Sequence, residues 1–316
     1  MKPRNILWIL LAMLLIVSAL FLFWGLNERN IAYNLPRRAI KLLAIAITGA
    51  AVAFSTVSFQ TVVGNNILTP SIIGLDSLYL FIQTLIVFTM GANQLALMSS
   101  VTDFLLSVAV MVGFSLLLYR LMFRREGTRL FMIILTGVML GSLFSSMATF
   151  MQVMIDPNEF LVVQARMFAS FNNVNVGILG ISCILMAGAA AYGWSQTKQL
   201  DVLSLGRDIS INLGIAYDHS VRRTLILVAV MTAVSTALVG PIAFLGLLVA
   251  NLAKQLLPTY RHRIIIPGAV LLALIALIGG QFLVERVFAF NTPISVIINF
   301  VGGIYFLYLL LREGRV

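Results

Sequence analysis

The sequence predicts an all-α protein whose helices cross a membrane about ten times. Of its 316 residues, 60% are hydrophobic and only 10% are charged, and the mean hydropathy is +1.03. A soluble domain carries roughly 25% charged residues, so this composition excludes an ordinary soluble fold. Apolar runs recur along nearly the whole chain. We therefore expect residues 1–316 to form one transmembrane domain, with no sizeable soluble part.

Eight apolar stretches have the roughly 20 residues that a helix needs to cross the hydrocarbon core. Two shorter stretches, at 77–91 and after Gly240-Pro241 as far as Leu257, bring the expected number of spans to ten. An even number places both termini on the same side of the membrane. The eight long stretches lie at about 5–26, 39–62, 101–122, 130–154, 176–196, 222–240, 264–284 and 294–311.

The first span follows Lys2 and Arg4, as the hydrophobic part of a signal peptide would. Its apolar run is longer than that of a usual signal peptide, and no small-residue cleavage site comes after it. The sequence therefore predicts an uncleaved first helix.

Basic residues indicate which side of the membrane each connection faces. They stand between apolar runs rather than on one basic face, so the net charge of +10 predicts no nucleic-acid partner. With a cytoplasmic N-terminus, the outside segments hold only Arg29, Arg37, Arg38, Lys41, Arg166 and Arg286. The inside segments hold Lys2, Arg4, Arg120, Arg124, Arg125, Arg129, Lys198, Arg207, Arg222, Arg223, Lys254, Arg261, Arg263, Arg312 and Arg315. This bias follows the positive-inside rule and places both termini in the cytoplasm.

Three of the outside arginines lie at span ends: Arg37 and Arg38 at an entrance, and Arg286 beside Glu285. Long basic side chains in such places either extend to the membrane interface or form a basic rim that captures an acidic partner. The residues alone leave these two interpretations even. For Lys41 we favour extension to the interface.

The segment from Gly240 to Leu257 is apolar enough for a membrane, yet Gly240-Pro241 interrupts it near its start. Non-helical backbone at membrane depth occurs only where protein or a water-lined cavity covers it. The sequence therefore predicts a re-entrant turn on the outer side followed by a short helix, which is typical of a transporter core.

The longest connection runs from about Thr197 to Tyr217 and is polar enough to leave the bilayer. Leu205-Gly206 and Leu213-Gly214 are expected to stop or turn short helices within it. The charge distribution places this loop, at about 197–221, on the cytoplasmic side.

The sequence offers no set of residues for catalysis or metal binding. His219 and His262 fall in loops, Cys183 is the only cysteine, and the motifs HExxH, GxSxG and GxxxxGK[ST] are absent. Asp76 and Asp103 are the acidic residues nearest the bilayer, and both begin apolar runs where a helix N-terminus favours a carboxylate. We expect no enzyme activity, no cofactor and no metal. The lack of a mid-span charge also argues against ion-coupled transport.

Small and hydroxyl residues gather in the expected helix at 130–154. In membranes they usually allow close helix packing, and the alternative is a polar lining of a transport path. The residues concerned are Thr136, Ser142, Ser145 and Ser146, with Gly137 and Gly141 between them.

Five blocks, taken together and in order, resemble the permease subunits of bacterial iron-siderophore and vitamin B12 ABC importers, the FecCD/BtuC type. They are LPRRAIKLLAIAITGAAVAFSTVSFQT at 35–61, NNILTPSIIGLDS at 65–77, SLGRDISINLGI at 204–215, GPIAFLGLLVANLAK at 240–254 and TPISVIINFVGGIYFLYLLL at 292–311. The resemblance covers nearly the whole chain. It implies the type II importer fold of ten helices in the bacterial cytoplasmic membrane.

The resemblance also implies partners: a second permease subunit, two cytoplasmic ATP-binding subunits, and a periplasmic or lipid-anchored siderophore-binding protein. Arg37 and Arg286 match basic positions that receive acidic residues of the binding protein, and Arg38 is next to the first. Gly240-Pro241 would lie beside the translocation path. The residues that would couple to the ATP-binding subunits are Ser204, Leu205, Gly206, Arg207, Asn212, Leu213 and Gly214.

Two departures from the family pattern indicate a subgroup. Ala250-Asn251 replaces a Pro-His pair, and Gly64-Asn65-Asn66 replaces an Arg-Asn-Pro turn. The segments at 65–83 and 156–173 are similar to catecholate-siderophore permeases of the petrobactin and vibriobactin type. The expected cargo is therefore a ferric siderophore of the catecholate class. A vitamin B12 or heme permease of the same fold and an ion-coupled secondary transporter are the alternatives.

Overall fold

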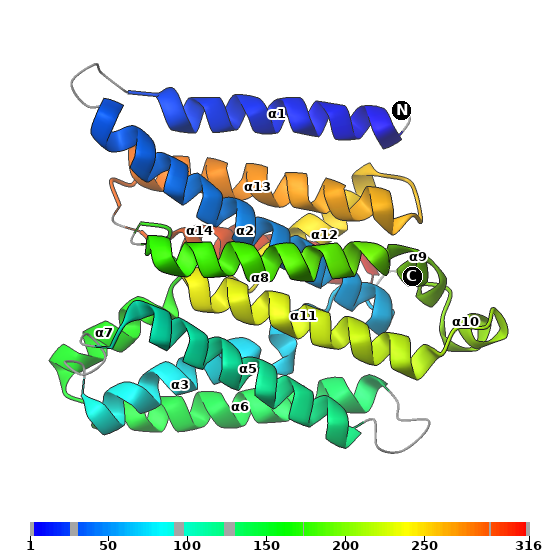
Figure 1. The fold of residues 1–316 in the computed structure, drawn as a ribbon, viewed down its shortest axis with the longest axis horizontal. Helices are drawn as coiled ribbons and strands as arrows, with labels where there is room; N and C mark the ends of the chain where they lie inside the picture. The colour runs from blue at the N-terminus through cyan, green and yellow to red at the C-terminus, as the bar shows by residue number, and fades with distance from the viewer. Residues whose placement is uncertain are drawn as a thin grey trace.

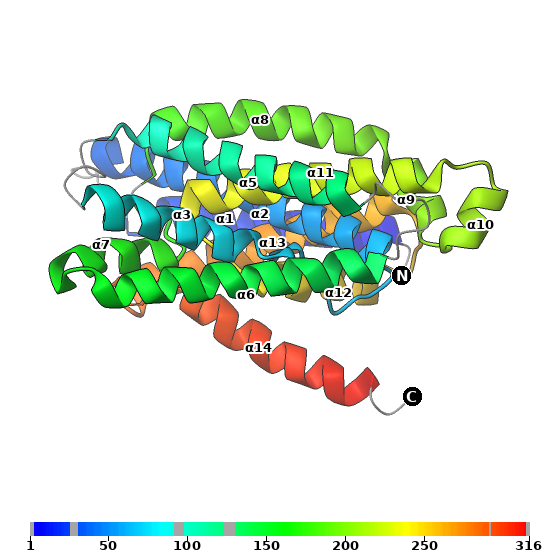
Figure 2. The same ribbon diagram turned by 90° about the horizontal axis from the view of Figure 1, so that it is seen from below.

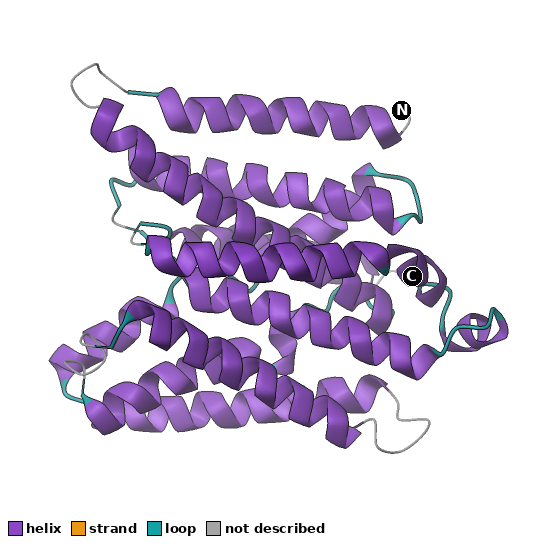
Figure 3. Ribbon diagram, in the orientation of Figure 1, coloured by secondary structure: helices purple, strands orange, loops and turns teal. Residues whose placement is uncertain are grey.

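The computed structural model describes residues 3–25, 31–91, 98–122, 130–172, 174–290 and 292–313, and the regular structure in these ranges is helical throughout. Figure 3 shows these helices in purple, joined by loops in teal. The expected all-α fold is confirmed. The expectations for Lys2, Arg29, Arg124, Arg125, Arg129 and Arg315 fall outside these ranges, as does the side chain of Arg312.

Ten apolar helices occupy the ten expected positions within the described part of the chain. Three are apolar over a shorter length: α3 (Leu75–Met90), α12 (Leu245–Leu256) and the part Ile294–Leu309 of α14 (Ile294–Glu313). Seven are long and apolar enough to cross a membrane: α1 (Pro3–Phe23), α2 (Ile31–Val63), α5 (Ser100–Met122), α6 (Leu130–Met154), α8 (Val176–Ser195), α11 (Tyr217–Val239) and α13 (His262–Arg286).

Helix α2 begins earlier than the sequence predicts, at Ile31 rather than near residue 39. Pro36 is the sixth residue of this helix and supplies no N–H for the carbonyl four residues earlier, yet the helix continues through it. Arg37 and Arg38 therefore stand on α2 itself rather than before it, and Lys41 lies on this helix as expected.

The described parts of the connections hold four short helices: η1 (Pro70–Ile73), α7 (Pro157–Met167), α9 (Thr197–Leu203) and α10 (Arg207–Asn212). The search for apolar runs did not predict α7, although the start of this helix carries clear signals. The Asp156 side chain accepts a hydrogen bond from the Asn158 main-chain nitrogen over 2.9 Å, and Pro157 occupies the first helical position. Both are standard features of a helix N-terminus.

Helix α2 forms the centre of the bundle, with α11 packed on one side and α13 on the other (Figure 1). Small residues along α2 permit this close packing, since a Cβ atom on Gly49 would lie only 2.9 Å from Leu274 Cδ2 of α13. α1 covers α13 from outside and keeps most of its own surface exposed. In Figure 2, α14 diverges from the other helices.

The two ends of the bundle differ. One end carries α9 and α10, which project beyond the other helices, together with the start of α1 and the end of α14 (Figures 1 and 2). We call it the α10 end. The opposite end carries the last turns of α1 and α13 and the first turns of α2. The described termini thus lie on the same side, as the even number of spans predicts.

The Gly240-Pro241 break lies at the end opposite α10. Gly240 has φ = +101° and separates α11 from α12. The loop after α7 covers it, because Ser170 N donates to Val239 O over 2.9 Å and a Cβ on Gly240 would lie 3.1 Å from Phe168 O. Protein therefore covers this non-helical backbone, as its position in an apolar segment requires.

Candidate functional site

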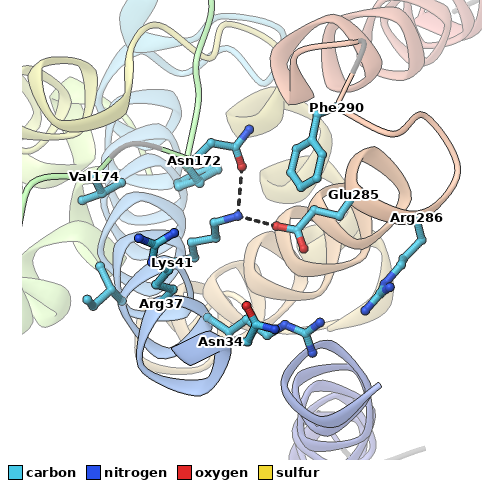
Figure 4. A pocket seen from close by; sticks show the side chains of 11 residues that line it. Asn34, Arg37, Lys41, Asn172, Val174, Glu285, Arg286 and Phe290 are labelled. Carbon is cyan, nitrogen blue, oxygen red and sulfur yellow. Dashed lines mark hydrogen bonds and ion pairs between the residues drawn. The ribbon is translucent and has the colours of Figure 1, made fainter. Parts of the chain in front are cut away.

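A cavity of about 550 Å³ opens where α2 and the end of α13 meet the loop before α8 (Figure 4). It brings together the three arginines that the sequence predicts for docking, and we call it the arginine pocket. Four basic side chains face a single acidic one in its lining. The lining residues are Asn34, Arg37, Arg38, Ile40, Lys41, Phe171, Asn172, Val174, Glu285, Arg286 and Phe290.

Lys41 and Glu285 form an ion pair inside the arginine pocket. Lys41 Nζ lies 2.7 Å from Glu285 Oε1 and donates to Asn172 Oδ1 over 3.1 Å, as the dashed lines in Figure 4 show. Gln281 Nε2 donates to the same two oxygens, over 3.0 Å each. The two charged side chains are only 17% and 11% exposed. Our expectation that Lys41 extends to the membrane interface is therefore wrong.

Arg38 and Arg286 bind the last turn of α1. Arg38 Nη1 donates to three carbonyl oxygens, those of Phe21, Leu22 and Trp24, over 3.2, 2.8 and 3.0 Å. Arg286 Nη2 donates to the Trp24 carbonyl oxygen over 2.8 Å. The last carbonyl groups of a helix have no intrahelical partner and attract cations. Both arginines therefore have a structural task that the sequence did not reveal.

Arg37 differs from its two neighbours in the pocket. It is exposed, and its guanidinium carbon lies 4.0 Å from the centre of the Tyr33 ring, one turn earlier on α2. This cation–π contact orients the side chain but uses none of its hydrogen-bond donors. Within the described ranges Arg37 makes no ion pair, so its donors are available to a carboxylate of another molecule.

At the α10 end, the predicted loop contains two short helices, and both Leu-Gly pairs stop them as expected. Gly206 and Gly214 adopt φ of +92° and +82°, in the left-handed region that favours glycine. Ser210 is the buried residue of α10, and its hydroxyl donates to Val202 O on α9 over 2.9 Å.

Apolar side chains on this loop point away from the bundle. Leu205, Ile209, Ile211 and Leu213 are 52%, 50%, 45% and 60% exposed. Ser204, Arg207 and Asn212 are exposed beside them. An exposed apolar cluster on a segment that projects beyond the other helices marks a surface for another protein. All seven residues predicted to couple to ATP-binding subunits therefore lie on one projecting element.

Comparison with known proteins decides what kind of molecule combines these features. Residues 5–312 match the model of the FecCD transport family. This chain belongs to that family. It is a multi-pass membrane permease, which transports rather than catalyses.

Two relatives of this FecCD permease match most of its length. The petrobactin import system permease protein YclO of Bacillus subtilis is 53% identical over 315 residues, which cover 100% of this chain and 99% of the relative. The petrobactin import system permease protein FatC of Bacillus anthracis is 39% identical over 277 residues, covering 88% and 78%.

A solved structure supports the fold of the FecCD permease. It is a metal-chelate type ABC transporter in an inward-facing conformation, similar with a TM-score of 0.83 and 22% identity over 98% of this chain and 99% of that one. At this identity the likeness concerns the fold alone.

The small residues on α6 of the FecCD permease serve close packing. A Cβ on Gly141 would lie 2.9 Å from Gly74 Cα, and one on Gly137 would lie 2.9 Å from Ile73 Cα. The backbones of α6 and the η1 turn therefore touch. This contact agrees with the interpretation of these glycines as packing residues.

The hydroxyl residues expected on the path divide into two groups. Ser145 Oγ donates to Ser77 Oγ on α3 over 3.0 Å, and Thr136 is half-buried. Ser142 and Ser146 are exposed on α6. Their hydroxyl groups would be unfavourable against lipid, so this face of α6 suits a second subunit or water.

Sequence reasoning missed a partly buried ion pair that attaches α7 to the bundle. Arg166 Nη1 lies 2.8 Å from Asp103 Oδ2, and Gln83 Nε2 donates to Asp103 Oδ1 over 2.9 Å and to Ser107 Oγ over 3.1 Å. Asp103 stands in the first turn of α5, as expected. A carboxylate near membrane depth calls for a cationic partner, and Arg166 was expected on the same side. That combination could have identified the pair.

The two departures from the FecCD pattern contact each other. Asn251 Nδ2 donates to Asn66 O over 2.9 Å. Lys254 Nζ, one turn further along α12, donates to Asn66 Oδ1 over 2.6 Å and to Gln60 Oε1 over 2.8 Å. The departures at 64–66 and 250–251 thus belong to one hydrogen-bonded unit at the α10 end.

Proposed function

We propose that this chain is the permease subunit of an ABC importer that carries a ferric siderophore of the petrobactin type, a catecholate, across the bacterial cytoplasmic membrane. The similarity to two petrobactin permeases over most of the chain supports this cargo. Residues 1–316 act as one transmembrane domain. The termini and the 197–221 loop face the cytoplasm, in line with the positive-inside bias.

The observation that carries this proposal is the projecting apolar surface on α10 and on the residues that flank it. Leu205, Ile209 and Leu213 extend beyond the bundle, where a cytoplasmic ATP-binding subunit can cover them. Two such subunits serve a pair of permeases. Closure of the ATP-binding subunits moves α9 and α10, and the helices around the path tilt in response.

A second permease subunit covers the exposed face of α6. Ser142, Ser146 and Thr149 recur there at helical spacing and are all exposed. When two permeases pair, these hydroxyl groups no longer face lipid and instead line the path between the subunits. The second subunit is either a copy of this chain or a similar permease, and membrane lipid surrounds the pair.

A siderophore-binding protein, periplasmic or lipid-anchored, docks at the arginine pocket. Arg37 supplies the free cation at the rim, while Arg38 and Arg286 add positive charge from beneath it. Acidic side chains of the binding protein complement this charge.

The test is uptake of ferric petrobactin by cells whose only siderophore importer is the complete complex that contains this chain. Leu213→Asp should reduce uptake and leave the permease in the membrane, because a carboxylate opposes burial at an apolar contact. His219→Asn, an exposed change nearby on α11, is the matched control.

Each result has a distinct meaning. Normal uptake with Leu213→Asp would overturn the coupling assignment. Uptake of heme or vitamin B12 but not of ferric petrobactin would overturn the cargo. Transport driven by an ion gradient alone, in vesicles without ATP-binding subunits, would favour a secondary transporter instead.

A further inference from the structure

A small polar cavity lies within the bundle, between α2, the η1 turn, the start of α3 and α11. Its volume is about 20 Å³, which is enough for one water molecule or one small ion. Oxygen-bearing side chains dominate its lining: one carboxylate, from Asp76, and hydroxyl groups that include those of Ser55, Ser71, Thr232, Ser235 and Thr236.

Asp76 differs from the other carboxylate near membrane depth. Asp103 pairs with Arg166, whereas the described contacts of Asp76 are with hydroxyl groups. Thr236 Oγ1 donates to Asp76 Oδ1 over 3.1 Å, and the Ser71 hydroxyl also contacts the carboxylate. The N-terminus of α3 supplies some positive potential but no full charge. A carboxylate within a membrane bundle ordinarily has a cationic partner.

Thr232 gives a second, independent indication of a ligand. The residue is only 8% exposed, and its Oγ1 has no hydrogen-bond partner among the described residues. The same residue lines the cavity. A buried hydroxyl without a partner carries a desolvation cost that a ligand in the cavity would remove.

The backbone beside the cavity is also suited to binding an ion. Ile242 and Ala243 line it from the non-helical turn between α11 and α12. In membrane transporters, unwound segments of this type provide oxygen atoms for Na⁺. One carboxylate with several neutral oxygens also suits a hard cation of single charge.

We propose that this cavity binds one Na⁺ ion, held by the Asp76 carboxylate and neighbouring hydroxyl oxygens. The ion neutralises Asp76 and joins α3 and α11 beside the turn after Gly240. This proposal does not depend on which cargo the chain carries.

Heat unfolding of the full-length chain, purified with its bound partners, tests the proposal. Unfolding is followed in increasing NaCl, with choline chloride keeping the ionic strength constant. Na⁺ should raise the unfolding midpoint saturably, by at least about 2 °C. Thr232→Val removes one oxygen and no charge, and should weaken the apparent Na⁺ affinity about tenfold. Asp76→Asn should abolish the effect.

The matched control is Thr224→Val on the same helix. Thr224 is also buried, but its hydroxyl bonds to Ser220 O and does not line the cavity. The Thr224→Val protein should keep the wild-type dependence of the unfolding midpoint on Na⁺. In a direct binding assay, the wild-type protein should bind radioactive sodium more tightly than the Thr232→Val protein.

Equal midpoints of the wild type in both salts would show that the cavity holds only water and would overturn the proposal. An unchanged Na⁺ response in Asp76→Asn and Thr232→Val would place the ion elsewhere and would overturn it as well. If Asp76→Asn fails to fold, the comparison of Thr232→Val with Thr224→Val decides.

Discussion

The Asp201 carboxylate accepts two hydrogen bonds from His262, one from the main-chain nitrogen and one from the ring Nδ1, each over 2.7 Å. Asp201 belongs to α9, and His262 is the first residue of α13. The opposite end of α13 supplies Glu285 and Arg286 to the arginine pocket. A single helix therefore connects the element that would meet an ATP-binding subunit with the pocket that would meet a binding protein.

We predict that Asp201→Ala weakens this connection. It removes the acceptor for two donors at the start of α13, so the free energy of unfolding should fall by about 1–3 kcal/mol. The ratio of cargo transported to ATP hydrolysed should fall as well, measured in proteoliposomes with the complete importer. Lys198→Ala, an exposed change on the same helix, should alter neither quantity. Unchanged coupling in Asp201→Ala would mean that α13 does not transmit the motion.

The ion pair in the arginine pocket should respond differently to single and double replacement. Lys41→Met leaves the Glu285 carboxylate without its cation, and we expect a loss of about 3–5 kcal/mol in unfolding free energy. Lys41→Met combined with Glu285→Leu should recover most of this loss, because no unpaired charge remains. The measurement is chemical unfolding of four proteins: the wild type, Lys41→Met, Glu285→Leu and the double variant. Additive effects of the two changes would contradict direct pairing.

Gly74 and Gly64 allow steric and conformational costs to be separated. Both have positive φ, +85° and +68°. A Cβ on Gly74 would lie 2.6 Å from Gly141 Cα, whereas one on Gly64 would meet nothing within 4 Å. Gly74→Ala should therefore prevent stable folding, and Gly64→Ala should cost only about 1–2 kcal/mol. Folded yield and unfolding midpoint distinguish the two, and similar values would argue against the contact between η1 and α6.

Arg37 and Arg38 should have separable roles although they are adjacent. Arg37→Glu should weaken association with the cognate binding protein, most visibly at low salt, and leave the unfolding midpoint unchanged. Arg38→Ala should lower the midpoint, because the Phe21 and Leu22 carbonyl groups lose this donor and the Trp24 carbonyl keeps only Arg286. Binding at several salt concentrations and unfolding by heat measure the two effects. An Arg37→Glu affinity equal to that of the wild type at every salt concentration would contradict docking at this rim.

The positions of the membrane helices followed from the sequence because hydrocarbon imposes a minimum apolar length on each span. The Gly240 break and the ends of α9 and α10 were also predictable, since glycine conformation is a local property. The contacts of the charged residues could not be predicted from the sequence. Lys41 and Glu285 are separated by 244 positions, and nothing in the periodicity of α2 or α13 indicates that they meet. Short helices such as α7 were missed because they carry no long apolar run.

The contacts at the end of α1 set an order of assembly. α1 is made first, and it keeps much of its surface exposed, with Trp8, Leu15 and Ile16 more than half accessible. Arg286, which binds the Trp24 carbonyl, follows 262 residues later. The last turn of α1 thus obtains its second arginine only after the helices from α2 to α12 have been synthesised. In a truncated chain that lacks α13, only Arg38 would hold the end of the first helix.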